Sequence, residues 1–133
     1  MAPSFMTESP FLNAAAGRPA QHTPVWFMRQ AGRSLPEYRE IRGKGSILDA
    51  IAQPELSAEI TLQPVRRHNV DAAVLFSDIV VPVHATGFGI DVTPGTGPVA
   101  DRPFRSRNDL QRLPPLTPEH IQHVTKTVDI LVN

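Results

Sequence analysis

The chain has 133 residues, with 13 Lys plus Arg balanced by 13 Asp plus Glu, and it contains no cysteine. The lack of cysteine excludes disulfide-stapled scaffolds and thiolate metal sites, and the zero net charge argues against a general nucleic-acid or membrane-surface binder, which needs a basic field. The sequence has no apolar run of bilayer length and no signal-peptide pattern, so we expect a cytoplasmic protein.

Short elements are expected throughout, because fourteen prolines interrupt the chain at about twice the usual frequency. Residues 1–22 are predicted to be a tail. Within it, Ser9, Pro10 and Gly17 hold the positions of a helix N-cap, a first turn and a stop signal, which indicates a short helix. The run from Thr23 to Met28 is apolar and predicts a buried strand that leads into a polar loop.

Helical signals follow this strand. A short helix is predicted from Leu35 to the glycines at positions 43 and 45. Residues 46–67 are predicted to form two helices parted at Gln53-Pro54, and Leu56 and Ile60 share one face of the second. Pro64 lies inside that helix and removes the hydrogen bond to the Ile60 carbonyl, so we expect a kink or an early end.

The run Val70–Phe76 is almost continuously apolar and predicts a strand of a parallel sheet covered on both faces. Strand, helices and strand make a βαβ unit, which indicates an α/β fold. Further elements are expected over 82–86 (helical turn), 89–93 (half-exposed strand), 94–98 (turn), 106–113 (capped short helix) and from Thr117 onward (helix). The last helix has no stop signal before Asn133, so we expect it to be cut in mid-element.

The first group that could carry chemistry is the string Arg29-Gln30-Ala31-Gly32-Arg33. Arginine binds carboxylate or phosphate through two parallel hydrogen bonds, and Gly32 would let a ligand approach the backbone. An anion clamp is therefore one interpretation. The other is that both arginines pair with nearby acids such as Glu37 and Glu40 on a solvated surface.

The second group is Ser77-Asp78, which follows the run Val70–Phe76. Ligands of parallel α/β sheets bind beyond the carboxyl ends of the strands, where a carboxylate can accept N–H bonds, coordinate a cation or act as an acid or base. An Asx-turn or a helix N-cap is the alternative, structural interpretation. If the two predicted strands are neighbours, Asp78 and the arginine pair lie on one rim.

Other motifs are weaker. His120 and His123 lie three residues apart on the last helix, but no acid or cysteine partner is evident, so we predict no metal site. The turn at 94–98 lacks the spacing and the lysine of a phosphate loop. Arg66 and Arg67 are expected to form the polar end of a helix.

Several segments together closely resemble the uroporphyrinogen decarboxylase family, in the same order and at similar spacing. They are Pro24–Arg33, Leu35–Arg39, Thr61–Pro64, Asp71–Ala73 and Phe76–Ile79, and the resemblance runs from about Pro24 to Leu113. Ser34 departs from the aromatic residue that many members carry, and we expect only local repacking there. A corrinoid-linked methyltransferase of the same superfamily is disfavoured, because the string Met28–Arg33 is typical of the decarboxylases.

The resemblance implies a (β/α)8 TIM barrel that acts as a homodimer in haem biosynthesis, without a metal or an organic cofactor. Such enzymes remove carbon dioxide from the acetate side chains of uroporphyrinogen III and release coproporphyrinogen III. By this likeness Arg29 and Arg33 bind substrate carboxylates, and one of them is a candidate proton donor to the pyrrole. The backbone of residues 29–33, including Gln30, Ala31 and Gly32, lines the cleft. Asp78 accepts the pyrrole N–H groups and stabilises the cationic intermediate.

Length limits this expectation, because such a barrel needs about 250 residues. We therefore expect residues 1–22 to be a tail with a short helix and residues 23–133 to be the N-terminal part of the barrel, incomplete in this chain. The Tyr, hydroxyl residue and His that later strands supply in the family have no counterpart here. The chain alone is expected to be inactive. The alternative is a non-catalytic remnant that binds anions or a partner chain.

Overall fold

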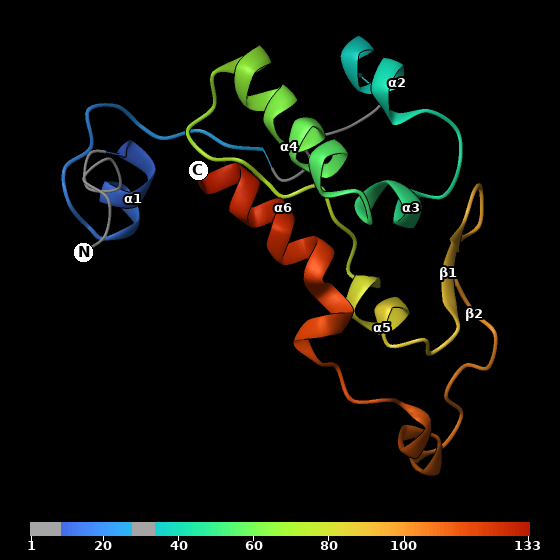
Figure 1. The fold of residues 1–133 in the computed structure, drawn as a ribbon. Coiled ribbons are helices and arrows are strands. Elements are labelled where there is room, and N and C mark those ends of the chain that lie inside the picture. The colour runs from blue at the N-terminus through green and yellow to red at the C-terminus, as the bar shows by residue number, and fades with distance from the viewer. Residues whose placement is uncertain (1–8, 28–33) are drawn as a thin grey trace.

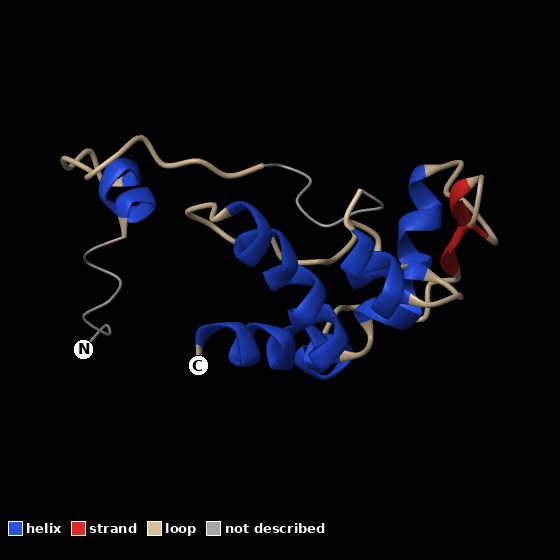
Figure 2. Cartoon of the chain, turned by 90° about the horizontal axis from the view of Figure 1, so that it is seen from above, coloured by secondary structure: helices blue, strands red, loops and turns tan. Residues whose placement is uncertain are grey.

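The computed structural model of the protein describes residues 9–27 and 34–133 (Figure 1). Its α-helices are α1 (Pro10–Ala15), α2 (Pro36–Arg42), α3 (Ile47–Ile51), α4 (Pro54–His68), α5 (Val81–Ala85) and α6 (Gln122–Val132). Its strands are β1 (Ile90–Thr93) and β2 (Gly97–Ala100), and its 3-10 helices are η2 (Arg107–Arg112) and η3 (Pro118–Ile121). Figures 1 and 2 show α1 apart from the other helices, at the opposite end of the molecule from the β1–β2 hairpin.

The early helices begin and end where local signals predict. Ser9 caps α1, and its hydroxyl accepts a hydrogen bond from the Leu12 N–H at 3.5 Å. Pro36 occupies the first turn of α2, and Gly43 ends that helix with a φ of 64°, a value that favours glycine. The short helix predicted in the tail is α1, so that prediction is confirmed.

The predicted break at Gln53-Pro54 is also confirmed, since α3 ends at Ile51 and α4 begins at Pro54. An early end at Pro64 is wrong, because α4 continues through it to His68. Pro64 is fully buried, so its packing offsets the missing backbone hydrogen bond. The helix stops at Asn69, which adopts the left-handed conformation (φ 50°, ψ 46°) and donates its N–H to the Val65 carbonyl at 2.8 Å.

The two predicted parallel strands are wrong as strands for the described residues. Residues 23–27 and 70–76 are irregular, and a backbone hydrogen bond runs between them, from the Asp71 N–H to the Val25 carbonyl at 2.8 Å. A parallel strand needs a row of such bonds to its neighbours. At 70–76 the apolar pattern agrees with burial of Val70 and Phe76, but the buried segment predicted at 23–27 is wrong, because Val25, Trp26 and Phe27 are 46–50% exposed. In neither segment does the pattern say what bonds to the backbone. The βαβ unit is thus replaced by two adjacent irregular segments with helices between them, and Met28 lies outside the described residues.

The later elements mostly follow the prediction. Strand β1 alternates half-buried and exposed residues and pairs antiparallel with β2, with Ile90 opposite Ala100 and Thr93 opposite Gly97. Strand β2 was not predicted, because its Gly97-Pro98 start has the composition of a turn. The capped helix at 106–113 is η2, and the last helix starts as η3 before it continues as α6.

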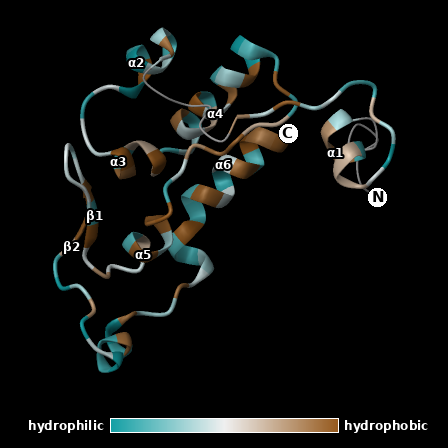
Figure 3. Cartoon of the chain, turned by 180° about the vertical axis from the view of Figure 1, so that it is seen from behind, coloured by the Kyte–Doolittle hydropathy of each residue, from teal (hydrophilic) through white to brown (hydrophobic). Residues whose placement is uncertain are grey.

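The core lies between α3, α4, α5 and the segment that precedes α5. Its buried members are Leu48, Ala50, Ile51, Ile60, Phe76, Val80 and Val81. Helix α6 packs on α4, and Figure 3 shows the hydrophobic colour along α3 and α6. Within residues 9–27 and 34–133, no helix is long and apolar enough to cross a membrane. The core contains Phe76, two residues before Asp78, and Val80, two residues after it, so it fixes the chain on both sides of Asp78.

Candidate active site

The predicted arginine clamp, residues 29–33, lies outside the described residues, so Arg29, Gln30, Ala31, Gly32 and Arg33 as binding residues stay a prediction. One acid that was considered as their partner is already engaged. The Glu37 carboxylate lies 3.7 Å from the Arg67 guanidinium, across α2 and α4. Arg66, at the end of α4, pairs with Glu59 at 2.7 Å, so the two arginines at this end of the helix have the structural role predicted for them.

Asp78 lies in the turn that leads into α5. Its Oδ1 accepts a hydrogen bond from the Val80 N–H at 3.0 Å, and its carbonyl accepts one from the Val81 N–H at 3.1 Å. This is the Asx-turn of the structural interpretation. In the part of the chain that the structure describes, no donor contacts Oδ2. The turn thus fixes the direction of the carboxylate and leaves one oxygen for a ligand, so the two interpretations of Asp78 are compatible.

The segment that carries Asp78 is anchored two residues earlier, at Phe76. The Ser57 hydroxyl donates to the Phe76 carbonyl at 2.9 Å, and the Phe76 N–H donates to Thr61 Oγ1 at 2.9 Å. Thr61 in turn donates its own proton to the Ser57 carbonyl at 2.7 Å. The prediction from sequence missed this pair. The available signal was the spacing of four residues, which places two hydroxyls on one face of α4.

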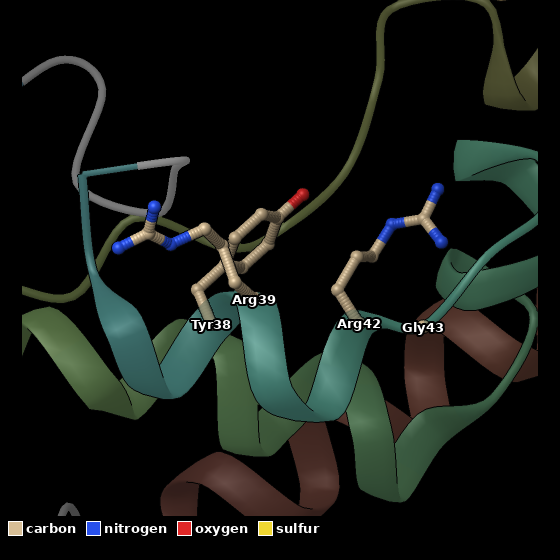
Figure 4. Close-up of a pocket in the computed structure, with 4 residues that line it drawn as sticks. All are labelled: Tyr38, Arg39, Arg42 and Gly43. Carbon is tan, nitrogen blue, oxygen red and sulfur yellow. The ribbon is translucent and has the colours of Figure 1, made fainter.

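A basic cavity of about 250 Å³ lies on α2 and is lined by Tyr38, Arg39, Arg42 and Gly43. Figure 4 shows the Tyr38 hydroxyl between the two guanidinium groups. The Arg42 guanidinium donates to the Gly45 carbonyl at 3.1 Å. Guanidinium and phenol donors together can hold a carboxylate. These residues were also missed from sequence, where α2 was described only as a short capped helix.

Phe76 connects this cavity to the Asp78 segment. Its ring meets the Tyr38 ring edge to face, with ring centres 6.1 Å apart and planes at 68°. Such pairs are favoured by the positive edge and negative face of aromatic rings. Phe76 therefore contacts Tyr38 of the basic cavity and also lies two residues before the Asp78 carboxylate.

A second carboxylate, Asp71, joins the segments that lead toward the arginine string and toward Asp78. It accepts hydrogen bonds from the Val25 N–H and from His22 Nε2, both at 2.7 Å. The Val25 N–H, followed by His22, lowers the pKa of Asp71, because both interactions favour the charged form. Asp71 thus holds the two segments together, although the described residues of neither segment form a strand.

His120 and His123 are the two histidines that were considered as metal ligands. His120 Nδ1 accepts from the Thr117 N–H at 3.0 Å and closes the cap of η3. Burial, followed by the proximity of His84, lowers the pKa of His123. Among the described residues, no cluster of His, Cys, Asp and Glu has the arrangement of a metal site.

Comparison with known proteins agrees with the resemblance. Residues 6–133 match the family described as Uroporphyrinogen decarboxylase (URO-D). The chain is 57% identical over 129 residues to the uroporphyrinogen decarboxylase of Streptomyces avermitilis, covering 97% of this chain and 36% of the relative. It is 55% identical over 130 residues to that of Salinispora tropica (98% and 35%) and 55% identical over 126 residues to that of Mycolicibacterium smegmatis (95% and 36%). The chain spans about a third of the length of these curated relatives, and it belongs to the uroporphyrinogen decarboxylase family.

Proposed function

We propose that this chain supplies the N-terminal part of a uroporphyrinogen decarboxylase, in which the acetate side chains of uroporphyrinogen III lose carbon dioxide to give coproporphyrinogen III. The family match over residues 6–133 carries the proposal. Residues 1–22 form the tail and residues 23–133 the first part of a (β/α)8 barrel of about 250 residues or more. The complete enzyme acts in the cytoplasm as a homodimer, and the chain alone is inactive.

Substrate binding is assigned to arginine. The substrate carries many carboxylates, and Arg29 and Arg33 bind them while the backbone at Gln30, Ala31 and Gly32 lines the cleft. The basic cavity on α2 supports this assignment, because Arg39 and Arg42 add two guanidinium groups on the element that directly follows the arginine string. Planar guanidinium groups favour carboxylates through paired hydrogen bonds.

The chemistry uses the pyrrole ring itself as the electron sink. Protonation of the ring carbon adjacent to the one that bears the acetate, with Arg29 or Arg33 as the donor, places a positive charge on the ring. The bond to the carboxylate then breaks, its electron pair moves into the ring, and carbon dioxide leaves. A proton added to the remaining methylene carbon gives the methyl group, and loss of the proton first added to the ring restores the pyrrole. No metal or organic cofactor enters this scheme.

Asp78 is the group that stabilises the cationic ring. Its Oδ1 is held by the Val80 N–H, which orients the carboxylate before substrate binds, and Oδ2 accepts the pyrrole N–H groups. A preorganised carboxylate favours the developing positive charge more than water does, because it needs no reorientation during the reaction.

A chimera tests the proposal. This chain replaces the matching 129-residue region of the Streptomyces avermitilis decarboxylase, and coproporphyrinogen formation is measured for the chimera and for the chain alone. We expect an active chimera and an inactive chain. Asp78→Asn should lower kcat by about 10²-fold or more, whereas Asp129→Asn, an exposed acid on α6, should not change it.

Each outcome decides a different point. Full activity of the Asp78→Asn chimera overturns the site assignment, and product formation by the chain alone overturns its inactivity. A chimera that folds cooperatively but is inactive overturns the function. That last result favours the second candidate, a non-catalytic anion-binding remnant, for which the basic cavity is the supporting observation and uroporphyrin binding by the isolated chain is the direct test.

A further inference from the structure

We propose that Ser57 and Thr61 are positioning residues, which hold the backbone of Phe76 so that Asp78 presents its carboxylate to the substrate. The inference rests on the proposed function, because it gives these hydroxyls a role toward the proposed catalytic carboxylate. Helix α4 would then position the site in addition to packing in the core. Ser57 and Thr61 act through the Phe76 backbone and touch no substrate themselves.

The first support is the pattern of hydrogen bonds around Phe76. In a β-strand, the backbone N–H and carbonyl groups bond to a neighbouring strand. Phe76 lies in an irregular segment, and both of its backbone polar groups bond to hydroxyls of α4 instead, at 2.9 Å each. Ser57 and Thr61 are each 1% exposed, so water cannot replace either bond. Loss of one partner would leave a buried N–H or carbonyl without a hydrogen bond.

The second support is the direction of the network. The Thr61 proton is committed to the Ser57 carbonyl at 2.7 Å, so its oxygen can only accept from the Phe76 N–H. The Ser57 proton is likewise committed to the Phe76 carbonyl. The Thr61 hydroxyl therefore has one arrangement that satisfies both of its partners, the Ser57 carbonyl and the Phe76 N–H, and in a buried setting such an arrangement is rigid.

The third support is the short path from Phe76 to Asp78. Only Ser77 separates them, and on the other side Asp78 is held by the Val80 N–H. Val80 and Val81 are buried in the same core cluster as Phe76. The backbone is therefore fixed on both sides of Asp78, at Phe76 and at Val80, and loss of the bonds at Phe76 would allow Asp78 to move.

Helix α6 offers a matched control for packing. Thr127 is also 1% exposed, and it also donates to the carbonyl four residues earlier, that of His123, at 2.8 Å. In the described ranges it makes no hydrogen bond to the Phe76 backbone. Thr61→Val and Thr127→Val thus remove the same helix-internal bond from equally buried sites, and only the first also removes the bond to Phe76.

The experiment measures kcat and KM in the chimera with the Streptomyces avermitilis enzyme. Thr61→Val should lower kcat by about 10-fold to 10²-fold at a KM changed less than about two-fold, because a misplaced group costs transition-state stabilisation rather than substrate affinity. Thr61→Ser should restore kcat, and Thr127→Val should leave it unchanged. If Thr61→Val does not fold, Ser57→Ala makes the same test through the Phe76 carbonyl.

Amide hydrogen exchange in the 133-residue chain supplies a readout that does not depend on turnover. The Phe76 amide should be protected in the unmodified chain and in Thr127→Val, and should exchange faster in Thr61→Val. An active chimera whose kcat is unchanged by Thr61→Val and by Ser57→Ala overturns the positioning role and leaves the proposed function intact. An inactive unmodified chimera with a protected Phe76 amide overturns the proposed function instead.

Discussion

Ile60 is the residue whose truncation tests the described core most directly. It lies on α4 with 0% of its surface exposed, among the core residues of α3, α5 and the Phe76 segment. The same chain offers a natural reference, because Ile79 is 92% exposed in the turn beside Asp78. Ile60→Ala and Ile79→Ala remove the same atoms from opposite environments.

The expected cost follows from burial. Each buried carbon removed from Ile60 costs about 0.8 kcal/mol in transfer free energy, and the cavity that remains brings the total to about 3–4 kcal/mol. In a chain of this size each kcal/mol lowers Tm by about 3–5 °C, so Ile60→Ala should lower Tm by about 9–20 °C. Ile60→Val, which deletes less, should cost about 1 kcal/mol. Ile79→Ala should stay within about 0.5 kcal/mol of the unmodified chain.

The assay is thermal and urea unfolding of the 133-residue chain, followed by circular dichroism. The slope of the urea transition should be the same for all variants, so that a shift in midpoint reports stability. Equal losses for Ile60→Ala and Ile79→Ala would refute the reasoning, because they would show that α4 does not bury Ile60 in preference to the turn residue. A graded loss from valine to alanine at position 60 supports it.

Three further outcomes are expected. The N–H groups of Arg105 and then Ser106 hold the pKa of Asp109 at about 2, below its usual 3.8. The stabilisation that Asp109 gives to the η2 cap is therefore complete above pH 3.8 and is lost as the pH falls toward 2. A titration of this carboxyl group followed by NMR should show the lower midpoint, and a midpoint near 3.8 would contradict the prediction. Asp71→Asn should weaken the bond to Val25 and speed exchange of the Val25 amide, and unchanged protection would show that the carboxylate does not hold this segment. Ile79→Ala, neutral in the 133-residue chain, should lower the Tm of the chimera, because we expect the remainder of the proposed barrel to cover this exposed side chain; neutrality in both proteins would argue against that cover.

Local structure was predictable from the sequence where a residue acts on its own neighbours. Ser9, Ser46 and Pro54 mark helix starts by capping or by preset backbone angles, and the structure has helices there. Strand β2 was missed because a Gly-Pro start has turn composition, and its pairing with β1 depends on a partner ten residues away at the open end, Ile90 opposite Ala100. Propensity carries little information about such partners.

The failure at 70–76 has the same origin. An apolar run reports that a segment is buried, but it does not say which groups will bond to its backbone. The partners of Phe76 are Ser57 and Thr61, 19 and 15 residues earlier. On the site, the structure shows the Asx-turn that was considered for Asp78, and its role toward substrate stays a prediction. Arg39 and Arg42 gave no signal, since charges on a short helix are usually solvated.

The left-handed turn at Asn69 has a consequence for how this sequence can change over time. After it, the chain runs back along α4, so Phe76 meets Ser57 and Thr61 only if the stretch from Val70 to Phe76 keeps its length. One inserted or deleted residue in this irregular segment would move Phe76 out of register with the two hydroxyls and leave its buried polar groups without these partners. Natural insertions and deletions should therefore avoid residues 69–78 and gather at the tip of the β1–β2 hairpin.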